Sequence, residues 1–170
     1  MNFYEIEKKS TILQDIVDYA FVPGAWLKYY NFDIRPIPQD ILNKDPFFVW
    51  LSKYKYFAAI LKLDPYVCYD WHKDTRRGVG INMIITPHAR SFCVFTGNKE
   101  GVVFKTEELI YKPATYYLFN TQQDHTVFNF ETDRYMMSIE FELDKDALTF
   151  EDLLKDIKEN YIGSTPSTQE

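Results

Sequence analysis

The chain contains few of the residues that build thiolate metal sites or disulfide frameworks. Two cysteines occur in 170 residues, Cys68 and Cys93, and neither has CxxC or zinc-finger spacing. We therefore interpret both as reduced, small apolar residues. Histidine is also scarce, with three copies in the whole chain. Because imidazoles are so few, the position of each one bears on function.

Long apolar runs and an excess of positive charge are also lacking. No apolar run approaches the roughly 20 residues of a membrane-spanning helix, and the opening segment MNFYEIEKKS lacks the features of a secretory signal. These absences predict a soluble, cytoplasmic protein without a membrane partner. A formal net charge of -6 and a pI of about 5.1 argue against broad binding to nucleic-acid backbones.

Apolar and aromatic side chains are abundant. Hydrophobic residues make up 46% and aromatics 18% of the chain. At this length, the composition predicts one domain with a well-buried core, either rich in β-sheet or built around an aromatic-lined pocket. We expect a single domain over residues 1–162 and a disordered tail over residues 163–170, where the sequence is of low complexity.

The N-terminal part, residues 1–64, is predicted to be largely helical. Apolar residues recur at helical spacing within residues 10–21. The prolines of residues 36–46 favour a loop, because they remove backbone donors and restrict their neighbours. The apolar run at residues 47–63 favours a second helix, although its aromatics also suit a strand.

A further helix is predicted near the C-terminus, over residues 146–162. Its apolar residues fall on one face. Thr149 can cap its first turn, with Asp152 placed to bond the amide that the cap leaves free. Gly163 is the predicted stop signal.

Between the helical parts, residues 65–143 have the pattern of short strands separated by turns, one of them at residues 96–101. The predicted strands are residues 66–72, 79–85, 91–96, 101–106, 108–112, 115–120, 125–130 and 134–143. Eight closely spaced strands without intervening helices are typical of an antiparallel barrel or jelly roll. The predicted fold class is therefore mainly β with flanking helices.

His72, Asp74 and His125 form a candidate metal site. In an extended chain, His72 and Asp74 point to the same face, and His125 begins another predicted strand. Two imidazoles and one carboxylate match the facial triad of a non-haem iron(II) centre, which leaves positions open on the metal. An HxD pair on its own is more often a hydrogen-bonded polar turn, so this pair alone supports both interpretations.

Arg134 follows His125 by nine positions and opens the last predicted strand, where it shares a face with Ser138. On an inward face the guanidinium needs an anion, because a buried unpaired charge is expensive. A ligand carboxylate would meet that need, with Ser138 adding a hydrogen bond. The alternative is a surface arginine paired with Asp133 or Glu140.

Taken together, these residues resemble the pattern of the 2-oxoglutarate and iron(II)-dependent oxygenases: HxD, a distant His, and Arg about nine or ten positions later. The resemblance covers roughly residues 65–143. Small members of the family carry an Arg and an Asn after HxD, as in RGVGIN at residues 77–82. They also carry a run similar to NTQQDHTVFN at residues 120–129. Within the family, the chain looks similar to small aspartyl/asparaginyl- or prolyl-hydroxylase-like members.

The resemblance implies a double-stranded β-helix, the cupin-like jelly roll, that uses Fe(II), O2 and 2-oxoglutarate as cosubstrate. The implied iron ligands are His72, Asp74 and His125. The implied cosubstrate-binding residues are Arg134, Ser138, Arg77 and Asn82. Arg134 would bind the far carboxylate of 2-oxoglutarate. For Asn82, a strand position bonded inside the protein is an equal alternative.

The implied activity is hydroxylation of a substrate C–H bond, with release of succinate and CO2. Aspartyl/asparaginyl β-hydroxylases lack the carboxylate ligand, and halogenases leave its position free for halide. The presence of Asp74 therefore argues against both and favours hydroxylation. The implied substrate class is a protein side chain or a free amino acid.

Two other functions stay open for the sequence. A cupin-like binding module would keep the pocket without oxygen chemistry, and an interaction domain would carry the histidine and aspartate by chance. The complete triad with its arginine argues against the first. The spacing from His125 to Arg134 is left unexplained by the second. His88 follows a proline in a predicted turn, and we interpret it as a loop histidine.

Overall fold

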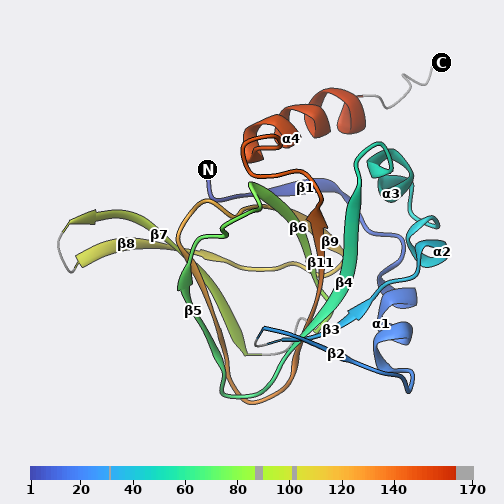
Figure 1. Cartoon of the computed structure of the whole chain (residues 1–170), viewed down its shortest axis with the longest axis horizontal. Coiled ribbons are helices and arrows are strands. Elements are labelled where there is room, and N and C mark those ends of the chain that lie inside the picture. Colours follow the sequence, from blue (N-terminus) through green and yellow to red (C-terminus); the bar gives the residue numbers. More distant parts are fainter. Residues whose placement is uncertain (31, 87–89, 101–102, 164–170) are drawn as a thin grey trace.

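The architecture is two antiparallel β-sheets that face one another, with helices packed against the outer side of the larger sheet (Figure 1). The computed structural model describes residues 1–30, 32–86, 90–100 and 103–163. Among those residues, no helix combines the length and the apolar character that crossing a bilayer requires.

The larger sheet has seven strands in the order β1-β9-β6-β11-β4-β3-β2. In that order, their bounds are Phe3–Lys9, Thr115–Asn120, Val79–Ile84, Arg134–Phe141, Tyr56–Leu63, Phe32–Pro36 and Leu27–Tyr29. The smaller sheet has four strands in the order β5-β10-β7-β8. Their bounds are Cys68–His72, His125–Asn129, Ser91–Glu100 and Val103–Leu109.

Strands β4 to β11 form a jelly roll. From β4 to β7, successive strands alternate between the larger and the smaller sheet, and from β8 to β11 they alternate again. The predicted double-stranded β-helix is therefore confirmed. The additional strands β1, β2 and β3 extend the larger sheet at its two edges, so that it is wider than the smaller sheet.

The helix predicted over residues 47–63 is wrong for its second half. Helix α3 spans Pro46–Leu51, and Tyr56–Leu63 is strand β4, which lies between β11 and β3. Both faces of β4 are covered: Ala58 packs in the main core, while Ala59 lines the space between the sheets. A strand buried on both faces shows no polar alternation, so periodicity alone does not distinguish it from a helix.

The N-terminal 64 residues contain more strand than predicted. Helix α1 (Leu13–Phe21) is confirmed, but β1 precedes it and the β2–β3 hairpin follows it. The predicted loop at residues 36–46 includes the short helix α2 (Gln39–Leu42). Strand β1 pairs with β9 alone, and Ile6 is its one fully buried residue, so its sequence carries little hydrophobic signal.

Two of the eight predicted strands are one strand. Strand β8 covers parts of both residues 101–106 and residues 108–112, and the turn predicted at residues 96–101 belongs largely to β7. The β7–β8 hairpin projects from the body of the protein (Figure 1). Gly97 occurs inside a strand because the register shifts there, which is typical of a bulge. Residues 65–143 therefore hold seven strands, β5 to β11, instead of the predicted eight, and β4 is the eighth strand of the jelly roll.

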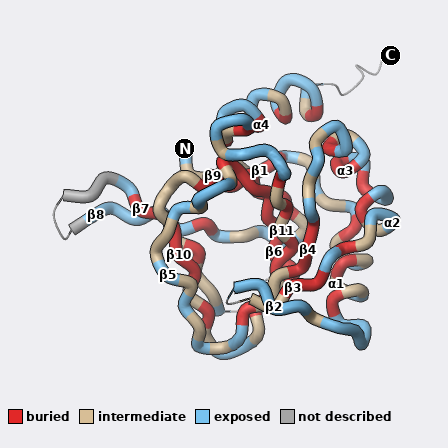
Figure 2. Tube along the Cα trace, in the orientation of Figure 1, coloured by how far each residue is buried: buried red, intermediate tan, exposed pale blue. Residues whose placement is uncertain are grey.

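The main core lies between the outer face of the larger sheet and the helices. Figure 2 shows buried positions concentrated along β6, β11 and β4. A second, smaller cluster fills one end of the space between the sheets. Its buried members are Leu63, Cys93, Phe95, Leu109, Tyr117, Phe119 and Val127.

The C-terminal helix is confirmed, although it starts later than residue 146. Helix α4 spans Phe150–Asp156 and continues as a π-helical segment, η1, over Ile157–Ile162. The Thr149 hydroxyl accepts a hydrogen bond from the Asp152 N–H, and the Asp152 carboxylate accepts one from the Thr149 N–H. This is the predicted capping box. The tail at residues 164–170 lies outside the described residues.

Asp45, which caps α3, joins the N-terminal segments to the larger sheet. It is 2% exposed, and its carboxylate accepts hydrogen bonds from the Phe47 N–H at 2.8 Å and from the Thr11 N–H at 2.8 Å. The Tyr116 hydroxyl of β9 donates a further bond at 2.9 Å. One buried side chain thus satisfies donors from three separate parts of the chain.

Replacing Asp45 with alanine is expected to lower the free energy of unfolding by about 3 kcal/mol, because several buried donors lose their acceptor. Urea denaturation of the purified protein measures the change. Asp40→Ala, at an exposed position of α2, is the matched control. Equal unfolding midpoints for the two variants would contradict this account of Asp45.

Candidate metal centre and its cavity

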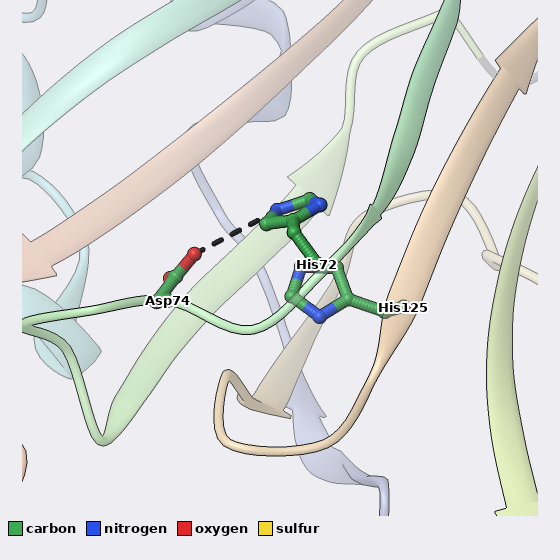
Figure 3. Close-up of side chains that lie close together, drawn as sticks. All are labelled: His72, Asp74 and His125. Carbon is green, nitrogen blue, oxygen red and sulfur yellow. Dashed lines mark ion pairs between the residues drawn. The ribbon is translucent and has the colours of Figure 1, made fainter.

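His72, Asp74 and His125 converge at one place in the space between the sheets (Figure 3). His72 ends β5 and His125 begins β10. The two are direct cross-strand partners, with ring centroids 4.2 Å apart. Asp74 lies in the loop after β5, where its N–H donates to the Thr121 carbonyl at 3.0 Å. One ligand atom from each of the three side chains lies within 4.8 Å of the others.

A bulge in β5 changes which side chain of this strand lies beside His72. His72 and Tyr69 pair with His125 and Val127, so three steps along β5 match two steps along β10. The extra residue breaks the strict alternation of faces and turns Tyr69 to the same side as His72. The Tyr69 ring centroid lies 4.2 Å from that of His72.

Both histidines are held in the orientation that suits a metal ligand. His72 Nδ1 lies 2.6 Å from the Asp70 carbonyl oxygen, and His125 Nδ1 lies 2.8 Å from the Gln123 carbonyl oxygen. A carbonyl oxygen only accepts, so each Nδ1 carries the hydrogen and each Nε2 keeps its lone pair. Such bonds fix the tautomer and the ring orientation of metal-binding histidines.

His125 is neutral at physiological pH. Burial lowers the pKa of its imidazole to about 4, and the neighbouring His72 acts in the same direction. A neutral imidazole is the form that donates to a metal. His125 is therefore already in the protonation state that can bind a metal.

This donor set fits iron(II). Two imidazole nitrogens and one carboxylate oxygen, with room for further ligands, are the donors of non-haem iron oxygenase sites. No thiolate joins the cluster among the described residues, which argues against a closed structural zinc site.

The triad lines a cavity of about 1020 Å³ between the two sheets. Small residues, among them Gly80 and Ala59, are part of its lining. Its mouth carries exposed aromatic residues: Tyr29 and Tyr30 at the end of β2, and Phe57 at the start of β4. Small-molecule sites typically occupy about 300–1,000 Å³. The cavity is therefore large enough for a small cosubstrate and part of a second molecule.

Arg134 lies inside this cavity, as predicted from the alternation of β11. It is 2% exposed, and its Nε donates to the Ser91 hydroxyl at 3.2 Å. Its Nη2 contacts the Met136 sulfur at 3.4 Å. Within the described part of the chain, no carboxylate lies at ion-pairing distance from this guanidinium. The surface pairing with Asp133 or Glu140 is therefore wrong: Asp133 pairs with Lys62 instead.

Tyr111 is a cavity residue that the sequence did not single out. Tyr111 is half-buried with a fully buried hydroxyl, its ring centroid lies 5.7 Å from Arg134 Cζ, and its hydroxyl has Asn82 and Cys93 as polar neighbours. The hydroxyl forms no hydrogen bond of normal geometry with any described residue. Burial raises the pKa of this phenol well above its usual value, so it keeps its proton. Tyr111 lies in the strand predicted at residues 108–112, but β8 ends at Leu109, so alternation along the strand does not give the direction of the Tyr111 side chain.

Ser138, Asn82 and Arg77, the other predicted cosubstrate-binding residues, also line the cavity. Ser138 lies beyond Met136 on the same face of β11 and is the cross-strand partner of Asn82. Arg77 also lines the cavity, but it is ion-paired with Asp74. His88 lies outside the described residues.

No protein-family model and no curated protein sequence matches the chain. Solved structures share its fold over most of its length. A 2OG-Fe(II) oxygenase family oxidoreductase from Burkholderia pseudomallei superposes with a TM-score of 0.56 at 10% identity, covering 81% of this chain and 79% of the other.

Two prolyl hydroxylases are also similar. The prolyl-4-hydroxylase of Pseudomonas putida has a TM-score of 0.55 at 11% identity, covering 84% of this chain and 92% of the other. A prolyl hydroxylase from Trichoplax adhaerens, in complex with a hypoxia inducible factor peptide fragment, has a TM-score of 0.58 at 13% identity. That match covers 90% of this chain and 86% of the other.

The fold is that of the 2-oxoglutarate and iron(II)-dependent oxygenases. Within this oxygenase fold, the chain has the two-histidine, one-carboxylate cluster that the sequence predicted, contributed by β5, the loop after it and β10. At these identities the similarity is one of fold, and the site rests on the residues of this chain.

In the metal-free protein, His125 is expected to make stability depend on pH. Its pKa is about 4 when folded and about 6.5 when unfolded, so the unfolded chain binds more protons between these values. The contribution of His125 to the free energy of unfolding is therefore complete above pH 6.5. It falls by up to about 3 kcal/mol as the pH drops to 4. Urea titrations across this range, in chelator, should show a weaker dependence for His125→Gln. Identical pH profiles for wild type and His125→Gln would contradict the lowered pKa of His125.

Proposed function

We propose that the chain is a 2-oxoglutarate- and iron(II)-dependent dioxygenase that hydroxylates a C–H bond of its substrate. One observation carries the proposal: a buried arginine without a carboxylate partner in the described chain shares a cavity with a His–Asp–His cluster. Burying an unpaired guanidinium is costly, so an anion from outside the chain would offset that cost. A dicarboxylic cosubstrate anchored at the metal supplies such an anion.

In this proposal, His72, Asp74 and His125 hold iron(II). When bound, iron and 2-oxoglutarate supply the oxidising chemistry: one atom of O2 enters the substrate C–H bond and the other enters succinate, with loss of CO2. The carbonyls of Asp70 and Gln123 keep both imidazoles oriented. No catalytic side chain is proposed beyond the three ligands.

Cosubstrate binding is assigned to the end of the cavity that holds Arg134. The planar guanidinium suits bidentate recognition of a carboxylate. The Tyr111 hydroxyl, buried and without a hydrogen-bond acceptor among the described residues, can donate to the same group. Asn82 and Ser138 line the cavity further along and are proposed to contact the cosubstrate from the larger sheet.

Aromatic side chains beside His125 exclude bulk water from its side of the metal site. The ring centroid of His125 lies 4.8 Å from that of Phe119 and 5.8 Å from that of Phe95. Both phenylalanines belong to the smaller core between the sheets. A dry surrounding strengthens every charge interaction in the site, because it lowers the local dielectric constant.

The proposed substrate is a protein side chain or an amino-acid-like molecule. The open mouth, with exposed Tyr29, Tyr30 and Phe57, offers apolar surface that a soluble protein rarely leaves uncovered without use. One of the similar structures is a prolyl hydroxylase in complex with a peptide fragment. A polypeptide side chain is therefore the first substrate class to test.

Anaerobic addition of iron(II) and 2-oxoglutarate is expected to produce the weak visible charge-transfer band of the chelate. The band should be absent in His72→Ala, which loses a ligand, and weakened in Arg134→Ala. Aerobic formation of succinate then separates an oxygenase from a cupin-like binding module. A folded, iron-loaded protein that shows no band would refute the oxygenase proposal.

Arg134→Ala is expected to weaken 2-oxoglutarate binding by about 10- to 100-fold, since a charge-assisted hydrogen bond contributes about 1.5–3 kcal/mol. Arg134→Lys keeps the charge but loses the planar fork, so an intermediate loss is expected. The dissociation constant comes from titrating the band with cosubstrate. Arg90→Ala, at an exposed arginine paired with Glu131, is the matched control. Equal affinities for Arg134→Ala and the control would remove Arg134 from the site.

A further inference from the structure

Arg77 contacts one oxygen of the proposed carboxylate ligand, and His72 lies near the other. The two oxygens of Asp74 have different neighbours: Oδ1 lies 3.7 Å from His72 Nε2, while Oδ2 lies 2.7 Å from Arg77 Nη2. Figure 3 shows one carboxylate oxygen directed at His72 and the other turned away from it. The Asp74 side chain is 11% exposed and Oδ2 is fully buried; its contact with Arg77 is an ion pair at short distance that lacks the geometry of a hydrogen bond.

The short segment from Asp74 to Arg77 is held rigidly. The Gln122 side-chain amide donates to both the Asp74 carbonyl at 2.9 Å and the Arg77 carbonyl at 2.6 Å. The adjacent Gly78 packs against the carbonyls of Lys145 and Leu148, so closely that a Cβ there would overlap them. The backbone that carries both side chains is therefore fixed by its neighbours in the fold.

We propose that Arg77 positions Asp74 for metal binding by engaging Oδ2, which leaves Oδ1 directed at the metal beside the histidines. This inference rests on the proposed function, because it concerns the same iron ligands. Partners of this kind orient metal-binding carboxylates, and their loss commonly weakens metal affinity by about 10- to 100-fold. The ion pair would also occupy Oδ2, so that Asp74 would offer one oxygen to a bound metal.

Other contacts of Arg77 are weaker. Its Nη1 lies 4.0 Å from Glu140 Oε2, and the Glu140 side chain is 37% exposed, so this pair is screened by solvent. Arg76 is exposed. Its carbonyl accepts a hydrogen bond from the Lys145 N–H, a contact that survives side-chain truncation. Arg76 is therefore a matched control of the same residue type, one position away.

The test is a titration with Co(II), an oxygen-stable substitute for iron(II), followed by visible absorption in the absence of cosubstrate. Arg77→Ala is expected to bind Co(II) about 10- to 100-fold more weakly than wild type. Its absorption band should also change shape, because the carboxylate is free to rotate. Arg77→Lys should recover part of the affinity, and Arg76→Ala should bind as wild type does. Metal-free unfolding midpoints verify that each variant is folded.

The outcomes separate this inference from the proposed function. If wild type binds no Co(II), the proposed metal site fails and the inference fails with it. If wild type binds Co(II), and Arg77→Ala binds it equally well with an unchanged band, Arg77 does not position Asp74 while the metal site stands. Unchanged Co(II) binding with weaker 2-oxoglutarate binding would likewise overturn the inference and assign Arg77 to the cosubstrate.

Discussion

The pairing of β5 with β10 is the constraint on which the site depends. It places His72 directly opposite His125, and the bulge within it turns Tyr69 onto the same wall. Backbone carbonyls then fix both rings through Nδ1, so that both Nε2 atoms remain available. Asp74 joins them because its N–H is bonded to Thr121, just before β10. A ligand set from distant parts of the chain thus depends on the backbone pairing of two strands.

The protein separates the surfaces that stabilise it from those that bind. The outer face of the larger sheet, covered by α1, α3 and α4, holds the main core and most of the buried apolar residues. The inner face carries the groups that are costly to bury, above all Arg134 and the Tyr111 hydroxyl. Because the main core supplies the stability, the inner face can keep a polar cavity. Strand β4 belongs to both surfaces, with Ala58 on one and Ala59 on the other.

Most of the jelly roll could be predicted from turn residues and alternation, and its errors have physical causes. The strand β4 is buried on both faces, so its run of apolar residues has no period that identifies a strand. The turn predicted at residues 96–101 lies largely within β7, because turn-forming residues also occur at bulges and hairpin ends. Gly97 is the clearest case, since it sits where β7 shifts register.

The chemistry of the ligands and the inward face of β11 follow from the order of residues, because alternation with a period of two assigns Arg134 and Ser138 to one side. Which groups meet depends on the folded chain. Tyr111 reaches the cavity from beyond the end of β8, where alternation no longer gives a direction, and Arg77 contacts an oxygen of Asp74 from a loop that Gln122 and Gly78 hold in place. Local periodicity gives the direction of a side chain along one strand. The distance between two side chains depends on how separate strands and loops pack.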